Sequence, residues 1–180
     1  MNEFIENNLE HVLCVLLLIS RLGDIISTYL VSPKLKLEAN PIAKRLGWRF
    51  CLLTVLVCLL PYYDTDIAIV VLVPSLLASS ANIGKFWIVR TMGEDEYYRR
   101  LLEFARKSKL SQALFSVFMS SFFIILAGLV LLVLCSYPEG DSGYWFGIGM
   151  ILFGFIVMLY GSNFFRVLFK KAQQSNGSKT

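Results

Sequence analysis

The chain has 180 residues, of which 56% are hydrophobic and 17% charged, and its formal net charge at pH 7 is +4. Soluble domains average about 25% charged residues, so this composition excludes a soluble globular enzyme, a disordered chain and a disulfide scaffold. A membrane-spanning helix needs about 20 apolar residues. The continuous apolar runs of this chain fit such helices and exclude the alternating strands of a transmembrane barrel. The composition therefore predicts an all-α integral membrane bundle.

Five apolar segments predict five transmembrane helices within a single domain over residues 1–169. The first segment has no basic residues ahead of it, unlike a signal peptide, so we expect it to be retained. The expected spans are residues 11–31, 47–63, 67–89, 110–135 and 144–168.

Two polar segments complete the predicted organisation. Residues 94–109, EDEYYRRLLEFARKSK, begin with acids and end with bases, which suits the helix dipole and predicts a cytoplasmic amphipathic helix. Two roles for it stay open, because such a helix either lies against anionic lipid or docks a soluble partner. Residues 170–180 are short and polar, and they predict a flexible cytoplasmic tail.

The basic residues predict the orientation of the chain. Lys and Arg concentrate on the cytoplasmic side of short loops, and 16 of the 17 lie on one predicted side, the exception being Arg21. This distribution indicates a multi-pass protein of the cytoplasmic (inner) cell membrane with the N-terminus outside and the C-terminus inside. If the first segment only lies on the membrane, four spans with the N-terminus inside fit the same distribution.

The cysteine and histidine content limits the chemistry that we expect. All four cysteines lie in apolar segments without a C-x-x-C pair, and His11 is the single histidine. A histidine-based metal site cannot be assembled within one chain from these residues. No phosphate-binding loop, nucleophile elbow or nucleic-acid module is recognisable. We expect no cofactor, no metal and no nucleic-acid partner, and the lipid bilayer as the surroundings.

A polar face on the first predicted helix is the main candidate site. Arg21 and Asp24 are three residues apart, and Ser27 and Thr28 continue the same face. Ionisable residues within a span mark functional sites by default, because a charge at the helix centre costs roughly 2.5–3.5 kcal/mol. Asn82 of the third segment is expected at the same depth as Asp24. The alternative is that Arg21 and Asp24 neutralise each other and merely fix helix packing.

The linker after this helix adds two candidate residues, Glu38 and Asn40. Asn followed by Pro41 is typical of a helix start, so Asn40 also reads as an N-cap, while Glu38 is a lone acid in a basic linker. The pattern D-x-x-S-T followed by E-x-N-P resembles the signature of an uncharacterised family of small prokaryotic polytopic membrane proteins. That resemblance implies no activity, but it adds weight to the six positions that carry it, which are Asp24, Ser27, Thr28, Glu38, Asn40 and Pro41.

Three glycines of the last segment, Gly147, Gly154 and Gly161, recur every seven residues. Such a stripe lets another helix approach closely, either within the bundle or in a homo-oligomer.

Three functions follow from these features. The favoured one is a non-catalytic membrane subunit or interaction protein that uses the glycine stripe and the amphipathic helix to hold a membrane-complex partner. The second is binding or transport of a small cation or polar solute at the residues around Asp24. The third and least supported is an intramembrane enzyme with Asp24 and Glu38 as an acid/base pair.

Overall fold

The computed structural model describes residues 8–135 and 142–177, with side chains to residue 174, and these parts are helical with no strand. In chain order the elements are α2 (Leu9–Val31), α3 (Pro41–Leu46), α4 (Trp48–Leu53), the 3-10 helix η1 (Thr54–Tyr62), α5 (Thr65–Met92), α6 (Glu94–Lys107), α7 (Leu110–Leu134) and α8 (Ser142–Gly177).

Four helices, α2, α5, α7 and α8, are long and apolar enough to cross a membrane. They correspond to four of the five predicted spans and confirm an all-helical bundle of the membrane type. The predicted second span is the one that falls short, because six residues of α4 and nine of η1 make it up. A 3-10 helix rises about 2.0 Å per residue, so the pair still extends about 27 Å.

Gly47 separates this segment from the short helix α3. Its φ of 65° lies in the left-handed region that favours glycine, and it ends α3 and precedes α4. Asn40 caps α3 rather than the second span itself: its Oδ1 accepts hydrogen bonds from the backbone N–H groups of Ile42 (2.9 Å) and Ala43 (3.4 Å), with Pro41 as the first helical residue. The N-cap interpretation of Asn40 is confirmed, and the helix that it starts is short.

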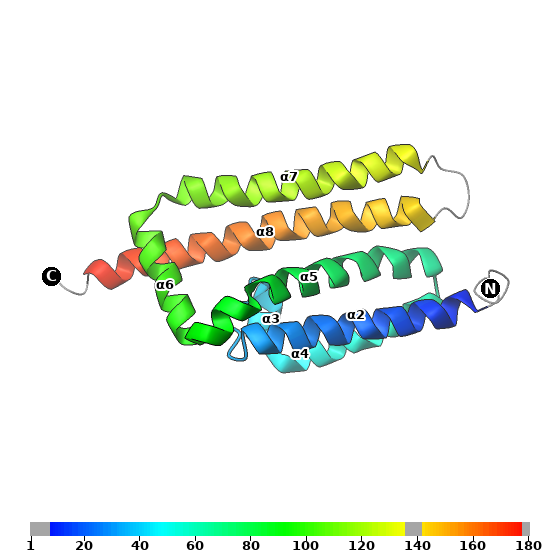
Figure 1. The fold of residues 1–180 in the computed structure, drawn as a ribbon, viewed down its shortest axis with the longest axis horizontal. Coiled ribbons are helices and arrows are strands. Elements are labelled where there is room, and N and C mark those ends of the chain that lie inside the picture. Colours follow the sequence, from blue (N-terminus) through cyan, green and yellow to red (C-terminus); the bar gives the residue numbers. More distant parts are fainter. Residues whose placement is uncertain (1–7, 136–141, 178–180) are drawn as a thin grey trace.

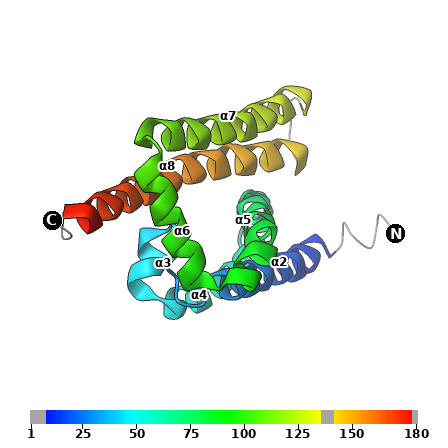
Figure 2. The ribbon, with the colours of Figure 1, turned by 60° about the vertical axis from the view of Figure 1, so that its left-hand side comes forward.

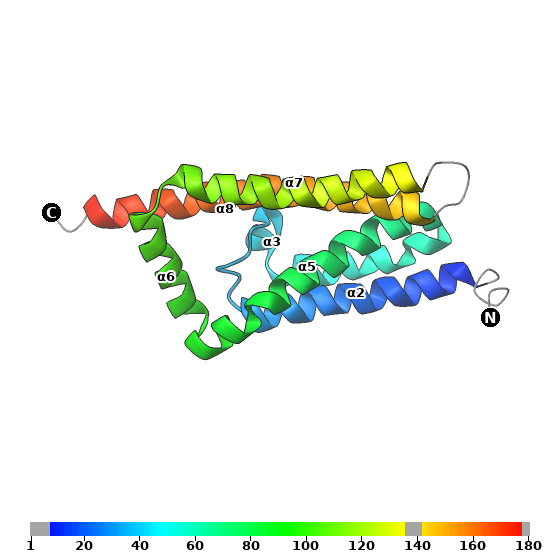
Figure 3. The same ribbon diagram turned by 45° about the horizontal axis from the view of Figure 1, so that its top comes forward.

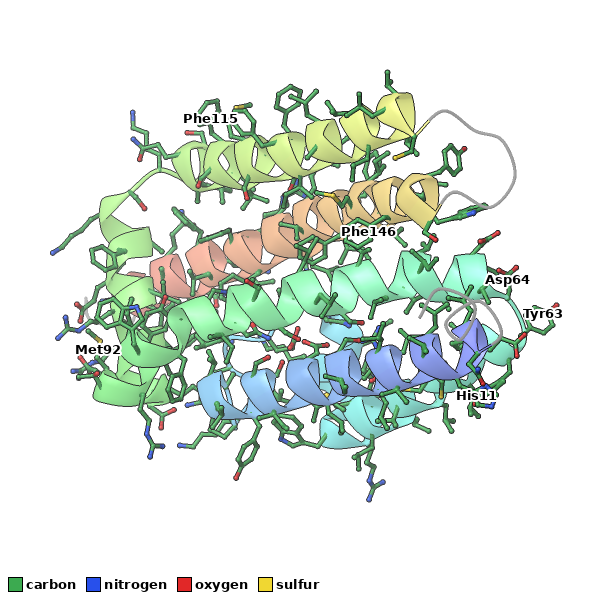
Figure 4. The ribbon with its side chains drawn as sticks, turned by 45° about the vertical axis from the view of Figure 1, so that its right-hand side comes forward. His11, Tyr63, Asp64, Met92, Phe115 and Phe146 are labelled. Atoms are coloured by element: carbon green, nitrogen blue, oxygen red, sulfur yellow. The ribbon has the colours of Figure 1, made fainter. Side chains whose placement is uncertain are left out.

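Five passes alternate in direction along one axis, namely α2, α4 with η1, α5, α7 and α8, so α2 begins at one end of the molecule and α8 finishes at the other (Figure 1). Asp64, Tyr63 and His11 lie at the end where α2 begins, and Met92 lies at the opposite end (Figure 4). We call this opposite end, where α3 and α6 lie, the basic end. The linkers that carry most of the lysines and arginines gather there.

The helices form two groups, which α6 joins along the chain and which pack on each other through α5 and α8. Helices α7 and α8 make a hairpin, and α2, α5, α4 and η1 make a second group (Figure 2). In the second group the small residues Ser20, Ser27 and Ser75 are at most 2% exposed where α2 meets α5. Small residues let membrane helices approach closely, so the α2–α5 seam is built on them.

The glycine stripe of α8 lies within the bundle. A Cβ on Gly147 would be 2.8 Å from the carbonyl oxygen of Gly128 in α7, and one on Gly154 would be 2.6 Å from Ile125 Cγ1. A Cβ on Gly161 would lie 3.1 Å from Val117 Cγ1, also in α7. Of the two alternatives for this stripe, the structure shows the contact within the bundle.

The apolar face of α6 also packs inside the molecule. Ala105 of α6 lies in a buried cluster with Leu168, Phe169 and Ala172 of α8. Because α6 covers Phe169 and Ala172, α8 continues to Gly177 instead of ending before the predicted flexible tail at residue 170. Part of the face that we expected against lipid or a partner therefore covers α8, while Phe104 on the same helix is 67% exposed.

Candidate functional site

Arg21 and Asp24 form the charged centre of the site within α2. The Arg21 Nη1 and Asp24 Oδ2 atoms are 3.5 Å apart, and the side chains are 17% and 25% exposed. The three-residue spacing thus places them on one helix face, as predicted. The Nε atom of Arg21 is buried and has no hydrogen-bond partner in the part of the chain that the structure describes. The pair is therefore mutually neutralised but leaves one donor available.

Asn82 reaches α2 one helical turn beyond Asp24. Its Nδ2 donates to Thr28 Oγ1 at 3.0 Å and to Ser27 Oγ at 3.5 Å, and the Ser27 hydroxyl donates to the carbonyl oxygen of Asp24 at 3.0 Å. Asn82 was expected at the depth of Asp24, and its side chain contacts the two hydroxyls on the next turn of α2. Earlier in α5, the Ser79 hydroxyl donates to the carbonyl oxygen of Ser20 at 3.5 Å.

Glu38 lies in the linker between α2 and α3, at the basic end. Its Oε1 accepts a hydrogen bond from the Asn40 backbone N–H at 2.7 Å, and its carbonyl oxygen accepts one from Lys44 Nζ at 3.4 Å. Its charge acts on Asp24 in α2 and on Lys85 in α5. We call Arg21, Asp24, Thr28, Glu38 and Asn82 the polar cluster. Asn40 is not part of it, because its side-chain oxygen is used in the cap of α3.

A cavity of about 380 Å³ adjoins Glu38 between α3 and α8. Lys44, Arg45 and Lys171 line it together with Tyr98 and Asn163. Burial and, secondarily, the neighbouring Lys171 ammonium lower the pKa of Lys44, while the Glu38 carboxylate acts in the opposite direction.

Aromatic rings face two of the bases in this cavity. Lys44 Nζ lies 5.8 Å from the centre of the Phe164 ring, and Lys171 Nζ lies 6.0 Å from the centre of the Tyr98 ring. These are cation–π distances. They hold the two ammonium groups against the cavity walls while like charges face each other across the opening.

A further carboxylate, that of Glu94 at the start of α6, is buried and was not among the predicted site residues. It is 7% exposed and accepts hydrogen bonds from Ser32 Oγ (2.5 Å), Lys34 N (2.8 Å) and Lys36 N (2.7 Å). Leu35, between the two donating amides, has a φ of 54°. Successive N–H groups around a left-handed residue form an anion-binding nest, and here the anion is part of the chain itself.

Asp95, on the exposed surface, adds ion pairs to the contact between the linker 34–36 and the start of α6. Its carboxylate lies 2.6 Å from Lys34 Nζ and 2.7 Å from Lys36 Nζ. Hydrogen bonds from these two ammonium groups lower the pKa of Asp95 to about 2. Both acids had been interpreted only as helix-dipole partners of α6. The opposite charges of the linker 34–36 and of residues 94–95 were the available signal.

Comparisons with protein-family models, with curated proteins and with solved structures find no match in any of the three. The family resemblance of the D-x-x-S-T and E-x-N-P positions therefore stays a prediction. In the described residues, 8–135 and 142–177, no three His, Cys, Asp or Glu side chains come together as metal ligands. The chemistry that the polar cluster offers is binding, through one guanidinium, two carboxylates and neighbouring hydroxyl and amide groups.

Proposed function

We propose that this chain is a multi-pass membrane protein that binds a small polar solute at the polar cluster. The observation that carries the proposal is the position of the Arg21–Asp24 pair inside a 23-residue apolar helix, where ionisable residues are rare and mostly functional. Glu38 extends that pair to a cavity at the basic end. The solute reaches the cluster through this cavity.

The orientation and the number of spans belong to the same proposal. The basic end faces the cytoplasm, because short loops rich in Lys and Arg stay on that side. With α4 and η1 counted as a crossing, the chain crosses the inner membrane five times, and its N-terminus is outside. The cavity beside Glu38 then opens to the cytoplasm.

The charges favour a polar solute with a negative group over a free cation. Arg21 already neutralises Asp24, and Lys44, Arg45 and Lys171 line the cavity. A cavity lined by one sign of charge concentrates the opposite sign and repels its own. A carboxylate or phosphate on the solute would match these bases and the available Nε of Arg21, while its hydrogen-bond donors would match Asp24 and Glu38.

The other two predicted functions have less support. A non-catalytic subunit was favoured because of the glycine stripe and the amphipathic helix, and both features contact other helices of this chain. That hypothesis stays a prediction that needs another surface. An intramembrane enzyme stays a prediction as well, since the coupling of Asp24 to Glu38 is equally expected of a binding site.

Thermal unfolding of the purified protein in detergent tests the proposal. The probes are zwitterionic amino acids, glutamate, inorganic phosphate, and sodium and potassium chloride. We expect a zwitterionic or anionic probe to raise the midpoint of the wild type, since a ligand at about 100 times its Kd stabilises by about 2.7 kcal/mol. Asp24→Asn and Glu38→Gln should remove this shift.

Asp66→Asn is the matched control, because it makes the same change of charge at the first turn of α5, away from the cluster. It should keep the full shift. A shift that Asp24→Asn retains, a shift from the simple salts only, or no shift with any probe would each contradict the proposal.

A further inference from the structure

A second cavity, of about 520 Å³, lies where α6 ends, α7 begins and α8 passes both. The three ribbons meet at this junction in Figure 3. The lining includes four basic residues, Arg106, Lys109, Arg166 and Lys170, and no acidic one. This distinguishes it from the cavity beside Glu38, in which a carboxylate lies among the bases.

A hydrogen bond to the backbone of α8 holds one of these bases in place. Arg106 Nε donates to the carbonyl oxygen of Ala172 at 3.4 Å, which fixes α6 against α8. The acidic residues in the described parts of the chain form no salt bridge with Lys109, Arg166 or Lys170. Like charges around one cavity repel each other, and an anion placed between them replaces this repulsion with charge-assisted hydrogen bonds.

The location selects the kind of anion. Leu110 and Phe169 form part of the cavity wall, and Leu110 is the first residue of α7, which is one of the four membrane-type helices. Further along α7, Phe115 and Phe122 are 64% and 52% exposed. The membrane-type helix whose first residue lines the cavity therefore also carries exposed apolar side chains, as an amphiphile with a charged head requires.

We propose that this cavity binds the phosphate headgroup of an anionic phospholipid, with its acyl chains along the exposed face of α7. Basic pockets between transmembrane helices on the cytoplasmic side are suited to such headgroups. The inference does not depend on the solute proposed above, because the two cavities have no lining residue in common.

Native mass spectrometry of the full-length protein, released from detergent after titration with phosphatidylglycerol or phosphatidylcholine, tests this site. We expect one phosphatidylglycerol molecule to be retained in preference to phosphatidylcholine. The double variant Arg166→Gln/Lys170→Gln should lower the affinity for phosphatidylglycerol on the order of 30-fold, from roughly fivefold per base. The charge-conserving variant Arg166→Lys/Lys170→Arg should restore most of the binding.

Arg99→Gln/Arg100→Gln is the matched control, because it removes two charges from an exposed face of α6 outside the cavity. It should bind like the wild type. Equal retention of the two lipids by the wild type would overturn the proposal even if a variant failed to fold. So would an equal loss in the control, or displacement of the bound lipid by millimolar inorganic phosphate, which would indicate a site for the free ion.

Discussion

At the scale of single residues, Glu94 shows how a buried charge organises a linker. Its carboxylate accepts three hydrogen bonds from Ser32, Lys34 and Lys36. These donors belong to the segment that follows α2, so the carboxylate fixes that segment against the first turn of α6. The left-handed φ of Leu35 is compatible with this arrangement because the amides on both sides of it are used.

Replacing Glu94 by Ala should lower the free energy of unfolding by about 3 kcal/mol. Hydrogen bonds to a charged group contribute roughly 1.5–3 kcal/mol, and the donors left behind would be buried without a partner. Unfolding by sodium dodecyl sulfate in mixed micelles, followed by tryptophan fluorescence, measures the change. Asp95→Asn serves as the control, since solvent screens its exposed pairs and they should contribute much less to stability. Equal losses in the two variants would contradict the nest.

Asp95 gives a pH dependence whose sign is fixed. Its folded-state pKa of about 2 lies below the ordinary value of 3.8, so its contribution to stability is complete above about pH 4 and is lost as the pH falls towards 2. The difference in unfolding midpoint between the wild type and Asp95→Asn should therefore shrink over this interval. A difference that stays constant from pH 5 to pH 2 would show that the pairs with Lys34 and Lys36 do not form.

Much of the site at this scale was readable from the sequence, because the relevant contacts are local. The three-residue spacing of Arg21 and Asp24 and the Asn40–Pro41 cap depend on neighbours within one helical turn, and both are as predicted. The contact of Asn82 with Thr28 depends on where α5 crosses α2. Counting residues along α2 and α5 predicted the depth of Asn82 relative to Asp24 only to within one helical turn.

At the scale of elements, the α7–α8 hairpin depends on close approach of two backbones. Gly128 and Gly147 face each other so closely that a Cβ on Gly128 would lie 2.7 Å from the Gly147 carbonyl oxygen. The seven-residue spacing of the glycines in α8 predicted a stripe. The spacing does not show which helix packs against that stripe. That choice depends on which neighbouring helix also presents a small residue at the same level.

Gly147→Ala should destabilise the protein by about 1–3 kcal/mol, the usual cost of overpacking, because the nearest neighbour of the added Cβ is the backbone carbonyl oxygen of Gly128, which cannot move aside. Gly84→Ala is the control: a Cβ there meets nothing within 4 Å, and Ala is the better helix former by about 1 kcal/mol. Thermal unfolding in detergent should shift in opposite directions for the two variants. Equal shifts would show that the hairpin is not packed at Gly147.

The segment 48–62 shows where composition is insufficient for an element. Its residues are as apolar as those of the other spans, but the change from α to 3-10 geometry at Thr54 depends on hydrogen bonding and on its packing beside α2. Apolar content predicts burial in lipid or protein and leaves the helix type undetermined.

At the scale of the whole molecule, the antiparallel passes place the two ends of the described chain at opposite ends of the bundle (Figure 1). If all five passes cross the bilayer, a tag before Met1 should be accessible only from outside and one after Thr180 only from the cytoplasm. Protease protection in spheroplasts and inverted vesicles measures this. Access to both tags from the same side would show that α4 and η1 do not cross.

The sequence by itself determined the class of the molecule, its long helices and the gathering of basic residues at one end, because these follow from composition and from periodicity within single helices. The tertiary structure decided which faces meet: α8 with α7 through glycines, α6 with α8, and Glu94 with the linker near Ser32. Contacts between residues some 60 positions apart depend on the angle and level at which helices pack. A local sequence pattern does not determine the packing angle or the level, because each apolar helix face can be buried equally well against several others.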